Sequence, residues 1–141
     1  MNAPTVCTGD LRIGSEMPPL VRTLDSVRII AYAGATWDWH RLHHDSAYAD
    51  ERGLPAPVID GQMLGALIAE ALLDWLGPRA FLRKLNFRLR SMVFANDTVR
   101  CVGQVSSIAS AEGRGEVAVA HQVRVDDRLV ADGSSLVILP A

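Results

Sequence analysis

The sequence Gly61-Gln-Met-Leu-Gly-Ala-Leu-Ile-Ala-Glu-Ala-Leu-Leu-Asp-Trp-Leu76 is apolar at nearly every position. Only Gln62, Glu70 and Asp74 interrupt it, so a helix over this range carries a thin polar stripe. A helix in a globular protein that is apolar almost all round must be enclosed by other structure. We therefore expect one long helix at residues 61–76, buried inside the domain.

The chain that follows this helix alternates apolar and polar residues, a period typical of half-buried strands. Runs of this kind cover residues 84–90, 99–105, 117–125 and 129–139. Polar turns separate them at Asn96-Asp97, Glu112-Gly113-Arg114-Gly115 and Asp126-Asp127. Strands joined by short turns pair in antiparallel order. The sequence therefore predicts an α+β domain in which one antiparallel sheet wraps around one long buried helix.

The part of the chain before residue 61 has shorter and less regular patterns. Residues 1–18 contain proline and glycine with little periodicity, so we expect a flexible N-terminal segment, in which 10–13 is a candidate short strand. Residues 19–141 then form a single domain. The elements predicted ahead of the long helix are a strand at 20–23, a helix capped by Asp25 or Ser26 and ended by Gly34, and a short helix at 46–52 capped by Ser46.

The composition restricts the class of protein. The 141 residues suffice for one domain with a sizeable core, and 49% of them are apolar. A net charge of -2 gives no basic surface, so neither nucleic acid nor a membrane is expected as a partner. The two cysteines form neither a disulfide framework nor a metal-binding pattern. With no signal peptide and no apolar segment long enough to span a bilayer, we expect a soluble cytoplasmic protein.

An acid and a histidine five positions apart, Asp38 and His43, lie in a segment without clear helical periodicity. A turn there can bring both side chains to one pocket. A carboxylate and an imidazole that hold a water between them can activate it, a pairing suited to reversible addition of water to an activated double bond. The spacing is equally compatible with Asp38 capping a turn and His43 having a structural role.

Gly61 opens the long helix. A glycine in the first turn lets a substrate approach the backbone, and its N–H at the positive end of the helix dipole can hold an oxygen that gains negative charge. The carbonyl oxygen of a thioester is a suitable group for this N–H to bind. The alternative is that Gly61 only permits a tight turn after Pro57.

These motifs together resemble a known family. The pattern Asp38-x-x-x-x-His43-x-Asp45, followed by Ala56-Pro57-Val58-Ile59-x-Gly61 and a long apolar helix, is similar to the MaoC-like dehydratases, the (R)-specific enoyl-CoA hydratases of the hot-dog fold. The resemblance implies that Asp38 is the catalytic acid, that His43 is the catalytic histidine and that the Gly61 amide binds the thioester oxygen. It implies no metal, flavin or nucleotide cofactor, because coenzyme A enters as part of the substrate.

The chain departs from the family pattern at three places. Trp37 stands where a glycine usually precedes the acid, His40-Arg41 replaces Asn-Pro, and Asp60 replaces a common histidine before the helix glycine. These departures resemble a branch of the family that acts on bulkier or branched acyl-CoA substrates.

Other residues are candidates for the substrate pocket. Trp37, Trp39, His40 and Gln62 flank the proposed catalytic residues, although the tryptophans also suit a core role. Arg83, Lys84, Arg88 and Arg90 share one strand and are candidates for binding the CoA phosphates, with a solvated strand face as the alternative. His40 and His44 have the spacing of zinc ligands, but Arg41 replaces the glutamate that zinc sites of that kind need, so no metal is expected. His121 is predicted to be a core histidine.

A sheet with one helix on its inner side has two edge strands, whose unpaired backbone N–H and C=O groups need to be covered or paired. Pairing two copies edge to edge solves this, as hot-dog proteins do, so we expect at least a homodimer, with a heteromer of related hot-dog chains as the second option. The leading function is an enoyl-CoA hydratase or 3-hydroxyacyl-thioester dehydratase. The alternatives are a hot-dog acyl-CoA thioesterase and a non-catalytic subunit of a heteromeric dehydratase.

Overall fold

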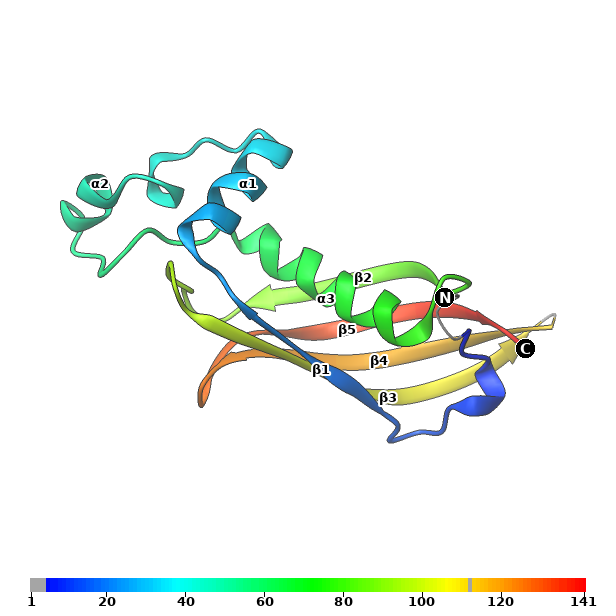
Figure 1. Ribbon diagram of the computed structural model, residues 1–141. Coiled ribbons are helices and arrows are strands. Elements are labelled where there is room, and N and C mark those ends of the chain that lie inside the picture. The colour runs from blue at the N-terminus through cyan, green and yellow to red at the C-terminus, as the bar shows by residue number, and fades with distance from the viewer. Residues whose placement is uncertain (1–4, 112) are drawn as a thin grey trace.

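One long helix lies across the inner face of a single antiparallel sheet, as Figure 1 shows for the computed structural model. The structure describes residues 5–111 and 113–141. The elements follow in the order η1 (Thr8–Asp10), β1 (Glu16–Thr23), α1 (Ser26–Thr36), η2 (Arg41–His43), α2 (Ser46–Asp50), α3 (Gly61–Leu76), β2 (Phe81–Leu89), β3 (Thr98–Ala111), β4 (Arg114–Val125) and β5 (Arg128–Pro140). The predicted α+β arrangement of sheet and helix is confirmed.

The five strands pair in the order β1-β3-β4-β5-β2, and every pairing is antiparallel. The strands β1 and β2 therefore form the two edges of the sheet. A bulge interrupts β1 between Met17 and Leu20, where Pro18 and Pro19 cannot donate hydrogen bonds to a neighbour. No helix among the described residues is both long and apolar enough to cross a membrane.

The helix α3 has the predicted bounds, and one face of it is enclosed, whereas Ala66 and Leu73 on its other face are exposed. Leu64, Ile68, Leu72 and Leu76 are fully buried and join one core with valines of the sheet. Gly65 allows close packing on β2, since a Cβ there would lie 2.5 Å from Cε1 of Phe87. The side of β2 that carries Phe87 thus faces α3.

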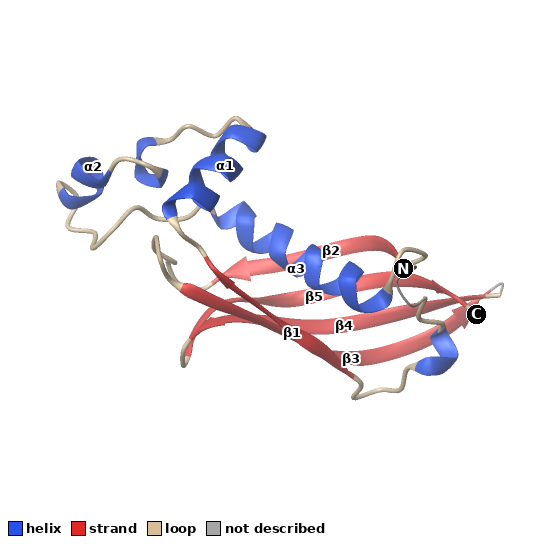
Figure 2. Cartoon of the chain, in the orientation of Figure 1, coloured by secondary structure: helices blue, strands red, loops and turns tan. Residues whose placement is uncertain are grey.

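The segment between β1 and α3 projects beyond one end of the sheet. Figures 1 and 2 show α1, η2 and α2, joined by loops, gathered at the N-terminal end of α3. An isolated bridge between Val58 and Phe94 and a hydrogen bond from Ile59 N to Val93 O connect this segment to the chain before β3. This projecting segment carries Asp38 and His43.

Several predicted boundaries were wrong for identifiable reasons. The helix α1 passes through Gly34 and ends at Thr36, because the residue that turns left-handed is Trp37, at φ 60°. The cap of α2 is Asp45, whose carboxylate accepts from Tyr48 N, and not Ser46; this helix ends at Asp50 rather than at residue 52.

The N-terminal part also differs from the prediction. Residues 10–13 form no strand, and β1 begins at Glu16, so the expected boundary after residue 18 falls inside a strand. The nearby turn η1 contacts the sheet, where Thr8 Oγ1 donates to the carbonyl of Pro140. The predicted turn at 112–115 is also shorter, because β4 starts at Arg114; Glu112 itself lies outside the described residues.

Candidate active site

The structure brings Asp38 and His43 together. Asp38 follows the left-handed cap of α1, and its N–H donates to Ala33 O at the helix end. His43 is the last residue of η2, which follows shortly after Asp38 in the sequence. Their closest atoms, Oδ2 of Asp38 and Nε2 of His43, are 3.8 Å apart. The His43 side chain is 15% exposed and that of Asp38 is 48% exposed, so the pair lies at the boundary between protein and solvent.

A backbone carbonyl orients the His43 ring. Nδ1 of His43 lies 2.6 Å from the carbonyl oxygen of Val58. Because a carbonyl only accepts, Nδ1 carries the proton, and in the neutral ring Nε2 keeps its lone pair. Nε2 is the nitrogen that faces Asp38. In the neutral ring, the unprotonated Nε2 therefore faces the Asp38 carboxylate.

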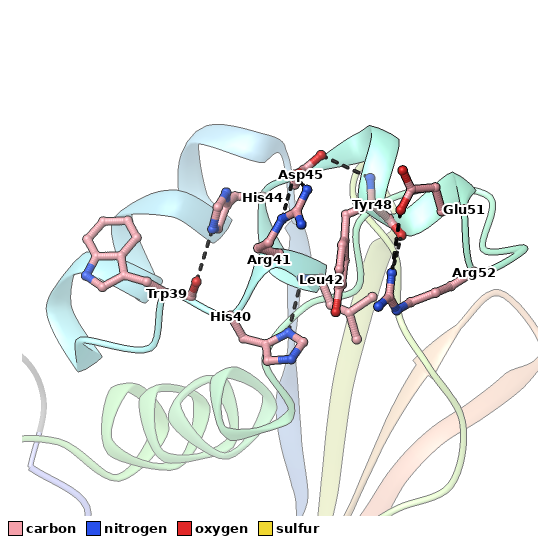
Figure 3. A network of polar contacts seen from close by, with 9 residues as sticks. All are labelled: Trp39, His40, Arg41, Leu42, His44, Asp45, Tyr48, Glu51 and Arg52. Carbon is pink, nitrogen blue, oxygen red and sulfur yellow. Dashed lines mark hydrogen bonds and ion pairs between the residues drawn. The ribbon is translucent and has the colours of Figure 1, made fainter.

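Contacts of charged side chains connect Arg41 to Asp45 and the first turn of α2, as Figure 3 shows. Arg41 donates to Asp45 Oδ2 from both Nε and a terminal nitrogen, at 2.9 and 2.6 Å. The N–H of Tyr48 and the Arg41 guanidinium hold the pKa of the Asp45 carboxyl below its usual value. Tyr48 also contacts two cations, with Arg41 at 4.3 Å and Arg52 at 3.3 Å from the ring centroid. These contacts fix η2 relative to α2.

Of the neighbouring histidines, His40 adjoins the pair, with its ring centroid 5.9 Å from that of His43, whereas His44 contacts Trp39. His40 accepts from Leu42 N through Nδ1, and its own N–H donates to Asp38 Oδ1 at 3.2 Å. His44 lies 3.2 Å from the carbonyl of Trp39 through Nε2. No cluster of three metal-ligating side chains occurs within the described ranges.

Gly61 is the first residue of α3. Asp60 caps the helix by accepting from Gln62 N, which gives this departure from the family pattern a structural role. The N–H of Gly61 has no acceptor within the described part of the chain. A Cβ at position 61 would lie 2.4 Å from Cδ1 of Leu89, so a larger residue here would require the Leu89 side chain to move. The Leu89 side chain fills the space beside Gly61, and no sequence signal pointed to this contact.

A cavity of about 360 Å3 adjoins His43. Its walls come from α1, from η2 and α2, from the loop before α3 and from the turn before β3. The residues that line it are Ser26, Ile29, Ile30, His43, His44, Ser46, Asp50, Leu54, Pro55, Ala56, Pro57, Ala95 and Asn96. The pocket candidates Trp37, Trp39, His40 and Gln62 do not line it. Trp37 is instead 80% exposed, with its ring edge against Trp39.

The basic residues Arg83, Lys84 and Arg88 of β2, and Arg90 just after it, do not gather at the reaction pair. Arg83 pairs with Glu116 and Arg90 with Asp132, whereas Lys84 and Arg88 have no ion pair within the described ranges. Since Phe87 and Leu89 contact α3, alternation directs Arg88 and Arg90 to the opposite face of the sheet. There they line a larger hollow of about 1040 Å3, whose lining includes no residue of the projecting segment.

The sequence predicted one member of a buried polar pair, His121, but not the other. His121 is buried in the core as expected, and Nε2 lies 2.9 Å from Oγ of Ser135. Its Nδ1 has no partner within the described residues. Burial lowers the pKa of His121. The apolar alternation of β4 indicated the burial, but no sequence signal pointed to Ser135.

Comparison with known proteins identifies the family. The family described as MaoC like domain matches residues 13–127. The 3-oxo-4,17-pregnadiene-20-carboxyl-CoA hydratase beta subunit of Mycobacterium tuberculosis is 29% identical over 96 residues, which cover 68% of this chain and 74% of that protein.

Two solved structures share the fold. The (R)-hydratase from A. caviae involved in PHA biosynthesis superposes with a TM-score of 0.85 at 21% identity, over 92% of this chain and 98% of that one. A chain of the ChsH1-ChsH2 complex from Mycobacterium tuberculosis gives a TM-score of 0.80 at 25% identity, with the same coverage. The predicted hot-dog fold is thereby confirmed.

Proposed function

Since the chain belongs to the MaoC-like domain family, we propose that it is a hydro-lyase that reversibly adds water to a trans-2-enoyl-CoA, or dehydrates a 3-hydroxyacyl thioester. The relative from Mycobacterium tuberculosis is itself named a hydratase of a CoA thioester. The observation that carries the proposal is the arrangement of Asp38 and His43, with Nε2 and Oδ2 separated by 3.8 Å.

This separation suits a shared water. It is too long for a direct hydrogen bond, and both facing atoms are acceptors when His43 is neutral. One water can donate a hydrogen to each, which leaves a lone pair of its oxygen free to attack. As that oxygen bonds to C3 of the enoyl thioester, the pair takes one proton from the water; it returns one proton to C2, so one water is added in balance.

The Gly61 amide has the complementary role. Addition at C3 places negative charge on the thioester oxygen, and a free N–H at a helix N-terminus stabilises such an oxyanion. The hydrogen bond from His43 to Val58 ties the base to the segment that leads into Gly61. The reaction then needs only proton transfer by side chains of this chain, with coenzyme A supplied as part of the substrate.

We also propose that the chain works as a dimer formed through β2. This edge strand exposes Phe81 and Leu89, whereas the other edge is interrupted by two prolines. The similar structures include a complex of two chains, and the similar hydratase is a beta subunit. A heteromer with a related hot-dog chain is therefore the second candidate assembly.

Two measurements test this proposal. Hydration consumes the enoyl-thioester absorbance and releases no thiol, whereas a thioesterase releases free CoA. Sedimentation of the wild type and of Phe81→Lys tests the assembly, and we expect the substitution to shift a dimer toward monomer. Activity that appears only after addition of a second hot-dog chain would identify the heteromer.

A further inference from the structure

The position of His43 depends on η2, a turn of only three residues. A single helical turn fixes several dihedral angles for one hydrogen bond, so it is unstable on its own and needs contacts from outside. On one side, Val58 N donates to Leu42 O, and Nδ1 of His43 donates to Val58 O. These two bonds hold the middle and the end of η2, and neither involves its first residue, Arg41.

The side chain of Arg41 holds the start of the turn. Its Nε and a terminal nitrogen both donate to Oδ2 of Asp45, at 2.9 and 2.6 Å. Oδ1 of the same carboxylate accepts from Tyr48 N in α2, and the Arg41 guanidinium lies 4.3 Å from the centroid of the Tyr48 ring. The carbonyl of Arg41 accepts from the N–H groups of His44 and Asp45. Both the backbone and the side chain of Arg41 are thus attached to the start of α2.

The backbone at the start of η2 has a conformation that suits proline. His40 is extended, at φ -60° and ψ 131°, in the region preferred by a residue that precedes proline. Arg41 is the first residue of the turn, where proline is tolerated, and its N–H donates no hydrogen bond within the part of the chain that the structure describes. A proline at position 41 would therefore restrict this backbone without losing a hydrogen bond. An arginine lacks that ring, so the restriction has to come from its side chain.

Building on the proposed hydratase function, we propose that Arg41 is a positioning residue for His43. Its contacts with Asp45 and Tyr48 fix the start of η2, so that Nε2 of His43 faces Oδ2 of Asp38. The side chains of Arg41 and Asp45 are 58% and 27% exposed, and an exposed ion pair adds little to the stability of a fold. Loss of the pair should therefore affect turnover more than unfolding.

Steady-state enoyl hydration by the assembled protein tests this role. Arg41→Ala should lower kcat about tenfold and leave KM close to the wild-type value, because a misplaced base slows proton transfer more than binding. Arg41→Pro should restore kcat to within about threefold of the wild type, because the proline ring restricts the backbone without the side-chain contacts. Asp45→Asn keeps the cap of α2 but loses the ion pair, and should resemble Arg41→Ala.

A second measurement is independent of turnover. Nuclear magnetic resonance of the His43 ring nitrogens reports which of them carries the proton. The wild type and Arg41→Pro should show the ring protonated at Nδ1, whereas Arg41→Ala should show both tautomers. Arg28→Ala is the matched control and should behave as the wild type in both measurements, because Arg28 is an exposed arginine of α1 in the same projecting segment.

An unchanged His43 tautomer in Arg41→Ala would overturn the inference, as would an Arg41→Pro variant that is as slow as Arg41→Ala. Absence of hydration by the wild type, together with a tautomer change in Arg41→Ala and Asp45→Asn but not in Arg28→Ala, would refute the proposed function and leave the positioning role of Arg41 supported.

Discussion

The side chain of Leu89 occupies the space that a side chain at position 61 would need. Its Cδ1 lies 2.4 Å from where a Cβ of residue 61 would stand, and Leu89 is nevertheless 52% exposed. The first residue of α3 and the last residue of β2 therefore constrain each other. The glycine has a packing role in addition to the amide role proposed for it.

A double-mutant cycle separates these two roles. Gly61→Ala alone should destabilise the protein by about 0.5–1.5 kcal/mol, because the new methyl group forces the half-exposed Leu89 side chain out of its present rotamer. In a Leu89→Ala background the same change should be close to neutral, because the obstacle is gone. Urea unfolding measures both differences. Gly34→Ala is the control, since its nearest contact is 3.5 Å away and helix propensity favours alanine by up to about 1 kcal/mol. Equal destabilisation by Gly61→Ala in both backgrounds would contradict the packing role.

Trp37 is expected to be a strained position. Its φ of 60° is left-handed, which costs a residue with a Cβ about 1–2 kcal/mol. The side chain is mostly exposed, so little packing offsets this cost. Trp37→Gly should therefore raise the unfolding free energy, and thermal and urea unfolding measure the change. Trp39→Gly is the comparison, because Trp39 has no positive φ; destabilisation by both substitutions would show that the tryptophan contacts outweigh the strain.

The two nitrogens of His43 can be tested separately. Asparagine at position 43 can place its amide near the Nδ1 position and still donate to the carbonyl of Val58, but it cannot act as a base. We expect His43→Asn to fold like the wild type and to lose about 10²–10⁴-fold in turnover. His44→Asn is the comparison and should lose much less turnover, because the His44 ring contacts Trp39 and makes no hydrogen bond or ion pair with Asp38 among the described residues. Turnover near the wild-type rate in His43→Asn would exclude His43 as the base.

Stability should depend on pH through His121. Burial lowers the pKa of this histidine in the folded protein, so the unfolded chain binds its proton more readily. Its contribution is complete above the unfolded pKa of about 6.5 and is lost as the pH falls below that value toward the folded pKa. Urea unfolding at pH 7.5 and 5.5 should show this loss in the wild type. His121→Gln should reduce the difference between the two pH values, and an unchanged difference would assign the pH dependence to other groups.

The sequence predicted the elements whose signal is local. The bounds of α3 followed from its continuous apolar composition, and β2 to β5 followed from alternation, because burial against one face imposes that period. The end of α1 was missed because glycine is the usual left-handed residue, and here a tryptophan adopts that conformation. The capping role of Asp45 was missed because Ser46 is an equally good cap by residue type.

The contacts of the candidate site also fall into two groups, local ones that the sequence indicated and long-range ones that it did not. Asp38 and His43 lie within one short segment, so the sequence allowed a turn to bring them together, although the spacing alone was equally compatible with structural roles. The contacts of Leu89 with Gly61 and of Ser135 with His121 join residues far apart in sequence, and the partner of His43 is a backbone carbonyl that no residue type reveals. The phosphate role predicted for Arg88 and Arg90 stays a prediction, with both now placed on the sheet face opposite α3.

The most direct test of the Asp38 and His43 assignment is the enoyl-thioester absorbance of crotonyl-CoA and of a longer trans-2-enoyl-CoA, followed together with free thiol. Wild-type protein in its native assembly should consume the absorbance and release no thiol. Asp38→Asn and His43→Asn should each slow this reaction by about 10²–10⁴-fold. Release of thiol by the wild type, or hydration that survives both substitutions, would contradict the account.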